Sequence, residues 1–273
     1  MSYARLLRDM FPGLGPVVDD LFLLEAHQIA DLPDRVPSRE LGVVLRAHPR
    51  LHRFLVTRCP AAEHPLAQLV DAHRPDGADD LEACEQAVVW EVADWIVYQR
   101  APEVYDAQAG IDWTIAAVTE VTTLADKVVI DAGAGTGRVA FDAAPAARHV
   151  FAVEPVATLR HFIRDKAERR RVNNLYALDG FLHAIPLPAA SADVLLTCQA
   201  IGWALPEEMA EIERVVAPGG VAMHLFGTPE AADPDQPLFR TLQASGYQPR
   251  TYQDDQLTIH AYAKTIEGCV RPC

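Results

Sequence analysis

Residues 128–137 read Val-Val-Ile-Asp-Ala-Gly-Ala-Gly-Thr-Gly, so three glycines follow directly after a short apolar run. The apolar run predicts a buried strand, and the glycines predict a tight turn that opens a helix. Such a turn lets the backbone approach a ligand without a Cβ in the way, and the helix start behind it offers N–H groups to an anion. The stretch therefore predicts a nucleotide-like ligand at the end of this strand.

The spacing of the glycines separates two kinds of nucleotide site. A dinucleotide site has the pattern Gly-x-Gly-x-x-Gly, which here requires a glycine at position 138. Arg138 stands there, and the third glycine, Gly137, comes one residue early. This spacing disfavours a nicotinamide oxidoreductase, which we keep only as an alternative.

Two further predicted strands also end in an acidic residue. His149–Glu154 reads as the next strand, and Glu154 stands where a nucleotide-binding α/β unit places the acid that binds ribose hydroxyls. Asn174–Phe181 reads as a third strand that reaches Asp179. Because parallel strands end at the same edge of a sheet, we expect these acids to line one crevice with the glycine turn.

In this order, the motifs resemble those of the class I S-adenosylmethionine-dependent methyltransferases. Residues 131–137 resemble the first motif of that family, and residues 186–200 resemble the stretch that leads into its fourth strand. Residues 205–221 resemble its helix, Pro-Gly-Gly turn and fifth strand. The resemblance covers about residues 98–265 and is closest to the branch with quinone-biosynthesis and other small-molecule methyltransferases.

The resemblance implies S-adenosylmethionine as the methyl donor and S-adenosylhomocysteine as the product. It implies that the glycine turn faces the methionine part of the ligand, Glu154 the ribose, and Asp179 the amino group of adenine. Cys198 ends the fourth strand beside the crevice, or alternatively serves as a small buried apolar residue. The expected cofactor-binding residues are Asp131, Gly133, Ala134, Gly135, Gly137, Glu154, Asp179, Gly180, Phe181, Cys198 and Gln199.

The alternation of strand and helix patterns predicts the fold of the C-terminal part. We expect an α/β fold with a doubly wound, mostly parallel seven-stranded sheet that has helices on both faces. Residues 247–253 and 257–265 read as a C-terminal antiparallel hairpin. We expect this methyltransferase domain to span residues 98–273.

Residues 1–97 carry apolar side chains at helical spacing and predict an all-helical region. Pro33, Pro37, Pro60 and Pro75 predict joints between about four helices. We expect this region to form part of the acceptor pocket as a substrate cap. The alternative is an interaction module on a protein that binds S-adenosylmethionine or S-adenosylhomocysteine without catalysis.

The charge of the chain limits the classes of binding partner. The net charge of −14 disfavours nucleic acid and anionic membranes, which require a positive surface.

Five scattered cysteines, together with the lack of an apolar leader or membrane-spanning run, predict a cytoplasmic protein. His48, His52, Cys59 and His64 match no zinc module, so we expect no metal. The oligomeric state stays open.

The expected reaction places few demands on catalytic side chains. A sulfonium already activates the methyl group, so the enzyme mainly aligns the acceptor and excludes water. No catalytic residue is identified, although His183 and His224 are conceivable bases. The sequence leaves open the identity and atom type of the acceptor.

Aromatic residues offer candidate walls for the acceptor pocket. Tyr105 and Trp113, with Tyr98, flank the junction before the first strand, and Trp203 follows the fourth strand. We expect these rings to line the acceptor site. The alternative is that they pack in a hinge or in the core.

Overall fold

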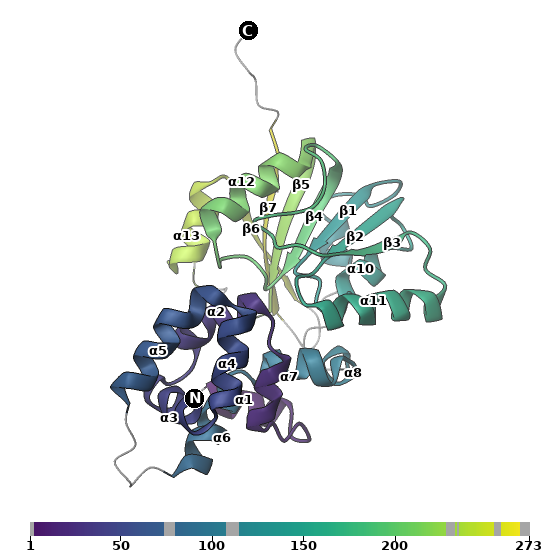
Figure 1. The fold of residues 1–273 in the computed structure, drawn as a ribbon. Coiled ribbons are helices and arrows are strands. Elements are labelled where there is room, and N and C mark those ends of the chain that lie inside the picture. The colour runs from purple at the N-terminus through teal and green to yellow at the C-terminus, as the bar shows by residue number, and fades with distance from the viewer. Residues whose placement is uncertain are drawn as a thin grey trace. The chain divides into compact units, whose positions relative to one another are not determined.

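The structure, a computed structural model, describes residues 3–73, 80–107, 115–227, 233, 235–253 and 258–267. The chain divides into two compact units, residues 1–107 and 108–273. Figure 1 shows the first unit as helices in purple to blue and the second as a sheet with helices in teal to yellow. Each unit is described by itself.

Every element described in the N-terminal unit is helical, which confirms the predicted all-helical region. The elements are α1 (Tyr3–Met10), η1 (Val18–Leu23), α2 (Ala26–Arg35), α3 (Ser38–Ala47), α4 (Pro49–Arg58), η2 (Pro60–Ala62), α5 (Glu63–Ala72), α6 (Leu81–Glu91), α7 (Ala93–Arg100) and α8 (Pro102–Asp106).

The expectation of about four helices is wrong, because prolines begin helices here as well as separating them. Pro49, Pro60 and Pro102 each stand in the first turn of a helix, where the missing N–H has no helical partner to lose. Pro33 even lies inside α2. Pro75 lies outside the described residues.

A single apolar cluster holds the N-terminal unit together. Leu41, Leu45 and Leu55, from the predicted apolar stripes, are at most 1% exposed in this cluster. Arg100 at the end of α7 donates from Nη1 to the carboxylate of Asp20 at 2.6 Å. This ion pair links α7 to η1, two segments that are far apart in the sequence.

The C-terminal unit contains a seven-stranded sheet. Its strands are β1 (Val128–Ala132), β2 (His149–Val153), β3 (Leu175–Leu178), β4 (Ala192–Cys198), β5 (Val216–Phe226), β6 (Gln248–Gln253) and β7 (Thr258–Thr265). The order across the sheet is β3-β2-β1-β4-β5-β7-β6. Strands β1 to β5 are parallel, and β7 is antiparallel to both β5 and β6. The predicted mostly parallel sheet with a terminal hairpin is confirmed.

Helices pack on both faces of this sheet. The helices are α9 (Ile115–Thr119), α10 (Arg138–Ala143), α11 (Ala157–Arg170), α12 (Leu205–Val215) and α13 (Pro237–Ala244). Val129 packs with residues of α9, α10 and α11, whereas its neighbour Ile130 packs with residues of α12 and α13. Successive residues of a strand point to opposite faces, so this division places two helical layers around one sheet.

The strand order reverses beside β1. The chain leaves β1 toward β2 and β3 and then returns to β4, on the other side of β1. Ligands of open α/β sheets bind at such a reversal, outside the carboxyl ends of the strands. The glycine turn follows β1, so it lies at this position.

The predicted Pro-Gly-Gly turn differs in form from the expectation. Residues 218–220 lie within β5, where the pairing with β4 is interrupted between Val216 and Val221. Gly219 has a φ of +82° at this interruption. The segment is therefore an irregularity within β5 instead of a turn before it.

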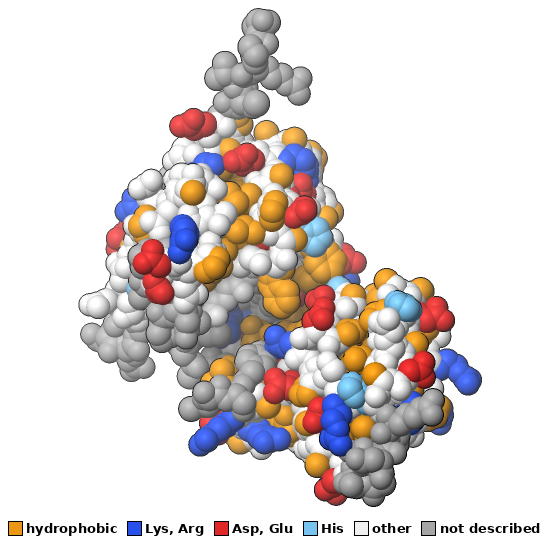
Figure 2. All heavy atoms as spheres, turned by 90° about the vertical axis from the view of Figure 1, so that its left-hand side faces the viewer, with side chains coloured by type: hydrophobic (Ala, Val, Ile, Leu, Met, Phe, Trp, Pro, Cys, Tyr) orange, Lys and Arg blue, Asp and Glu red, His pale blue; other side chains and the backbone are white. Residues whose placement is uncertain are grey.

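The described helices are short. The longest described helix, α11, has 14 residues, and no helix in the described ranges combines the length and apolar composition that a membrane span requires. On the face that Figure 2 shows, basic and acidic side chains are interspersed on both units.

Candidate functional site

The glycine turn has a backbone that only glycine adopts easily. Gly133, Gly135 and Gly137 have φ values of +71°, +57° and +78°. The N–H groups of Gly133 and Ala134 donate to the carbonyl of Val153 at 2.9 and 3.1 Å. The turn is thus fixed to the end of β2 before α10 begins.

Asp131, the last but one residue of β1, lies fully buried beneath this turn. Its Oδ2 accepts the N–H of Ala140 at 3.0 Å, which satisfies one of the otherwise unbonded donors in the first turn of α10. Its Oδ1 has no hydrogen-bond partner among the described residues. Burial raises the pKa of Asp131 to about 8, against the lowering effect of the Ala140 hydrogen bond and with a small contribution from Glu154.

Glu154 connects the ends of two strands. Its Oε2 accepts the N–H of Gly135 at 2.8 Å, and its Oε1 accepts the N–H of Val156 at 2.8 Å. Only 5% of the residue is exposed. An ionised carboxylate only accepts hydrogen bonds, so Glu154 is of the chemical type to which hydroxyl groups of a ligand donate.

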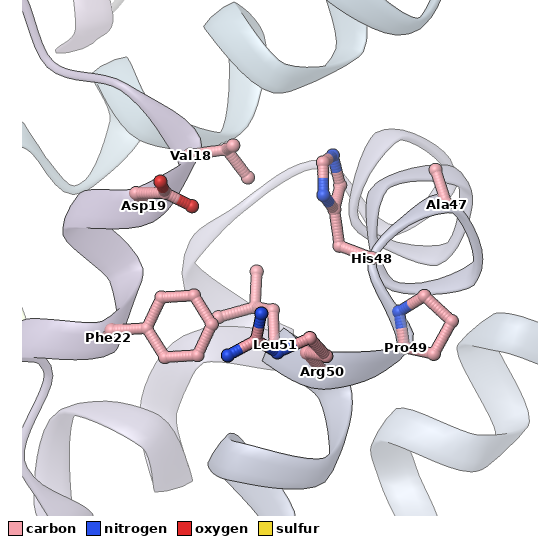
Figure 3. Close-up of a pocket in the computed structure, with 8 residues that line it drawn as sticks. All are labelled: Val18, Asp19, Phe22, Ala47, His48, Pro49, Arg50 and Leu51. Carbon is pink, nitrogen blue, oxygen red and sulfur yellow. The ribbon is translucent and has the colours of Figure 1, made fainter.

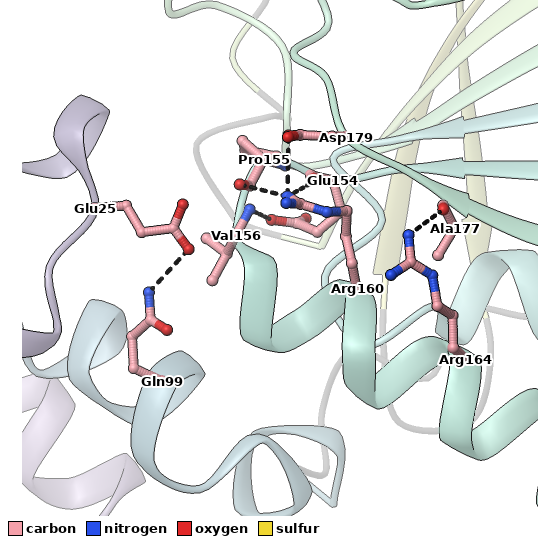
Figure 4. A network of polar contacts seen from close by, with 9 residues as sticks. All are labelled: Glu25, Gln99, Glu154, Pro155, Val156, Arg160, Arg164, Ala177 and Asp179. Carbon is pink, nitrogen blue, oxygen red and sulfur yellow. Dashed lines mark hydrogen bonds and ion pairs between the residues drawn. The ribbon is translucent and has the colours of Figure 1, made fainter.

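Asp179 follows β3 and has a partner that the sequence analysis missed. Arg160 in the first turn of α11 lies with Nη1 3.0 Å from Oδ1 of Asp179 (Figure 4). The same Nη1 donates to the carbonyls of Glu154 at 2.8 Å and Pro155 at 2.6 Å. In the sequence, Arg160 resembles an ordinary solvated arginine of a helix face. The available signal was its place in the first helical turn, where cations are disfavoured.

Gly180 and Phe181 continue from Asp179. A Cβ on Gly180 would lie 2.8 Å from Cδ of Pro186, so the absence of a side chain lets the chain fold back closely. The half-buried ring of Phe181 stacks on His183, with centroids 5.1 Å apart and planes 15° apart. These two residues thus form a flat aromatic pair after β3.

The end of β4 lies directly against the glycine turn. A Cβ on Gly133 would lie 2.3 Å from Cβ of Ala200. Gln199, with an exposed side chain, has a φ of +54°, and its N–H donates to the carbonyl of Leu225 at 2.9 Å. Cys198 is half-buried. The structure therefore brings the predicted residues after β1 and β4 together at one edge.

The aromatic candidates for the acceptor pocket lie in different units. Tyr105 belongs to α8 of the N-terminal unit, with its ring edge-on to Tyr98 at 4.7 Å. Trp203 follows β4 and is 71% exposed, so the alternative that it packs in the core does not hold. Trp113 lies outside the described residues.

A buried acid shapes the loop that carries Trp203. The carboxylate of Glu208, in the first turn of α12, accepts the N–H groups of Gly202 at 2.7 Å and of Trp203 and Ala204 at 3.2 Å. Glu208 is 2% exposed. The loop is thus fixed through its backbone, while the indole of Trp203 lies in solvent.

The two histidines considered as bases have different surroundings. His224 is fully buried within β5, and its Nδ1 lies 2.9 Å from Oγ1 of Thr197. Burial lowers the pKa of His224 to about 3. Burial to this degree does not suit a residue that exchanges protons with a ligand. His183 is exposed and stacks on Phe181.

The N-terminal unit contains a separate open cavity of about 460 Å³ (Figure 3). Asp19 and Phe22 line it from η1, and His48 and Arg50 line it from the start of α4. His48 also contacts the carboxylate of Glu85 at 2.5 Å. None of the candidate site residues lines this cavity.

Comparison with known proteins agrees with this geometry. Residues 130–224 match a family described as a methyltransferase domain. An uncharacterized methyltransferase of Mycobacterium tuberculosis is 32% identical over 124 residues, which are 45% of this chain and 46% of that protein. A malonyl-(acyl-carrier protein) O-methyltransferase of Serratia marcescens is 30% identical over 135 residues, 48% of this chain and 50% of that protein. The chain thus spans about half the length of the curated relatives it matches.

Among solved structures, a SAM-dependent methyltransferase from Aquifex aeolicus aligns with a TM-score of 0.47 and 15% sequence identity. The alignment covers 62% of this chain and 92% of that chain.

Proposed function

We propose that this protein binds S-adenosylmethionine and transfers its methyl group to a small-molecule acceptor. The proposal starts from the class I methyltransferase domain to which residues 130–224 belong. The observation that carries the proposal is the carboxylate of Glu154. It is bonded to the glycine turn through Gly135, at the strand edge where open α/β sheets bind nucleotides.

The residues present fit this ligand. The carboxylate of Glu154 is an acceptor of the kind that ribose hydroxyls donate to, and the exposed carboxylate of Asp179 suits the amino group of adenine. The ring of Phe181 suits an adenine face. The unpartnered Oδ1 of Asp131 lies beneath the turn that would face the methionine part.

The proposed chemistry depends on positioning. When bound, the sulfonium supplies an electrophilic methyl carbon, so the chain's own residues have to bind, orient and exclude water. No general base is part of the proposal, because an activated methyl group does not require one and His224 is enclosed in the sheet. Gln199 and Cys198, at the end of β4, would border the reacting end of the ligand.

A small acceptor is favoured over a nucleic acid by the net charge of −14. The Serratia marcescens relative is named for a malonyl group on a carrier protein, so carrier-bound small acids belong in the tested class. We propose that the helical N-terminal unit serves as a substrate cap, and that Trp203 of the C-terminal unit borders the acceptor site. We also propose a cytoplasmic location.

Calorimetric titration of the full chain tests the proposal. S-adenosylmethionine and S-adenosylhomocysteine should both bind, and NADH should show no comparable affinity. Release of S-adenosylhomocysteine should then appear when carrier-bound or free small acids and phenols are supplied as acceptors. Tight binding of NADH, with no binding of either sulfur ligand, would refute the assignment.

A further inference from the structure

Arg160 stands in an unfavourable place for helix stability. It lies in the first turn of α11, where the helix dipole favours acidic side chains and disfavours cations. Its side chain is nevertheless only 12% exposed and folds back over the helix start instead of extending into solvent. Its position therefore calls for a role outside the helix itself.

The contacts of Arg160 connect two strand ends directly, and Glu154 extends the connection to a third. Its Nη1 contacts Asp179 after β3 and the carbonyls of Glu154 and Pro155 after β2 (Figure 4). The carboxylate of Glu154 then accepts the N–H of Gly135 after β1. One side chain thus stands at the centre of a continuous polar network through all three loops.

We propose that Arg160 is a positioning residue: it ties the loops after β2 and β3 together and holds Asp179 as an acceptor for a 6-aminopurine. The proposal rests on the proposed function, since it names the part of the ligand that this network selects. Asp179 has a side chain that is 72% exposed, so without Arg160 it would sample many rotamers.

The chemistry of the pair explains the selectivity. An ionised carboxylate only accepts hydrogen bonds, so Asp179 suits the amino group of adenine and opposes the 6-oxygen of hypoxanthine. Oδ1 is engaged by Arg160, which leaves Oδ2 for the purine. Hypoxanthine would therefore place an acceptor against an acceptor, and a fixed carboxylate rejects it more strongly than a mobile one.

Arg164 provides a matched control. It lies one turn further along α11, and its Nη2 donates to the carbonyl of Ala177 in β3 at 3.0 Å (Figure 4). Arg164→Met removes the same charge from the same helix and also removes a bond to β3. It leaves the loops after β2 and β3 untouched.

The experiment compares binding of S-adenosylhomocysteine and S-inosylhomocysteine to the full chain and to Arg160→Met, Arg160→Lys and Arg164→Met. The wild type should prefer the adenine ligand about tenfold, the size of one hydrogen bond to a charged group. In Arg160→Met the adenine ligand should bind about tenfold more weakly, and the preference should fall to about twofold. Arg160→Lys should recover part of the preference, and Arg164→Met should retain all of it.

Hydrogen exchange without ligand gives a second readout. Peptides covering residues 153–157 and 178–182 should exchange faster in Arg160→Met than in the wild type and in Arg164→Met. An unchanged purine preference in Arg160→Met overturns the proposal, and so does an equal loss for both ligands that Arg164→Met reproduces. If the proposed function is wrong, the wild type binds neither ligand, and the selection of a 6-aminopurine is overturned with it. This result differs from a wild type that binds both ligands and a variant that keeps the purine preference.

Discussion

The carboxylate of Glu154 accepts a hydrogen bond at 2.8 Å from the N–H of Gly135, although the two residues lie 19 positions apart. The bond joins the end of β2 to a turn whose φ of +57° at Gly135 is uncommon for residues with a side chain. The turn is thus held in shape before any ligand arrives. Preorganisation of this kind lowers the entropy cost of binding.

Replacement of Glu154 by glutamine should therefore weaken the site in two ways. It removes the charge that supports the bonds to Gly135 and Val156, and it weakens an acceptor for ribose hydroxyls. We expect the affinity for S-adenosylhomocysteine to fall by about 1–3 kcal/mol in calorimetry. Glu168→Gln, on the exposed face of α11, is the control and should bind as the wild type does. Equal affinities of both variants would remove Glu154 from the site.

Gly133→Ala should destabilise the fold for two reasons, a steric clash and an unfavourable backbone conformation. The new Cβ would lie 2.3 Å from Cβ of Ala200, and the residue also has a φ of +71°. Gly219→Ala isolates the backbone cost, since Gly219 has a φ of +82° and a Cβ added there would meet no atom within 4 Å. We expect about 1–2 kcal/mol for Gly219→Ala and more for Gly133→Ala in urea unfolding.

The excess at Gly133 should depend on Ala200. In the double variant Gly133→Ala with Ala200→Gly, the steric contribution disappears and the cost should approach that of Gly219→Ala. Additive costs of the two substitutions would show that the two loops are not packed against each other.

The sequence predicted those parts of the fold that depend on local pattern. The apolar run of β1 and the glycines after it gave both the strand and the turn, because glycine and hydrophobic periodicity act on the local backbone. The acids Glu154 and Asp179 were placed at the same edge through the rule for parallel strands. The residues just before them, Val153 and Leu178, are partners in the sheet, which agrees with that placement.

The missed features depend on tertiary contacts. Arg160 is one of several arginines on α11, and only the folded chain brings its guanidinium to Asp179. The burial of His224 follows from its pairing with Tyr262 in β7 and from the nearby ring of Tyr247, which no local pattern around His224 reveals. The helices of the N-terminal unit were undercounted because a proline can begin a helix as readily as end one.

Asp131 should make stability fall as pH rises. Its pKa is about 8 in the folded chain and 3.8 as the ordinary value, so between these values the folded state holds a proton that the unfolded state has released. The contribution of this carboxyl to the free energy of unfolding is fully present below about pH 4 and is lost as pH rises through 8. The slope is at most about 1.4 kcal/mol per pH unit.

The Asp131→Asn variant removes this titration. The difference in unfolding free energy between wild type and variant, measured in urea from pH 5 to 9, should shift steadily in favour of the variant. Asp165→Asn, the same substitution on the exposed face of α11, is the control variant. A parallel course of the wild-type and Asp131→Asn profiles would contradict the burial of this carboxyl.

His224 should act in the opposite direction. Its pKa is about 3 in the folded chain and 6.5 as the ordinary value, so the unfolded state binds a proton that the folded state does not. The contribution of this imidazole to the free energy of unfolding is fully present above about pH 6.5 and is lost as pH falls toward 3. His224→Asn should keep a partner for Thr197 and lose less stability than the wild type between pH 7 and 5. An equal loss in both proteins would show that His224 reaches solvent.

Trp203 lies on a loop whose backbone is bonded to Glu208 of α12, so substitutions of these two residues should separate the function of the loop from its stability. Trp203→Ala keeps the backbone N–H that Glu208 accepts and removes only an indole that is 71% exposed. Urea unfolding should therefore change by no more than about 0.5 kcal/mol, and S-adenosylhomocysteine should bind as to the wild type. If the indole lines the acceptor site as proposed, turnover should fall about tenfold, which corresponds to roughly 1.4 kcal/mol.

Glu208→Ala should give the opposite result. It leaves three backbone N–H groups, those of Gly202, Trp203 and Ala204, without their carboxylate acceptor. Unfolding in urea should then require about 1–3 kcal/mol less, since each bond to a charged group is worth more than a neutral one. A large loss of stability in Trp203→Ala, together with weaker binding of S-adenosylhomocysteine, would instead assign the indole to the support of the crevice, and the acceptor wall would have to lie elsewhere.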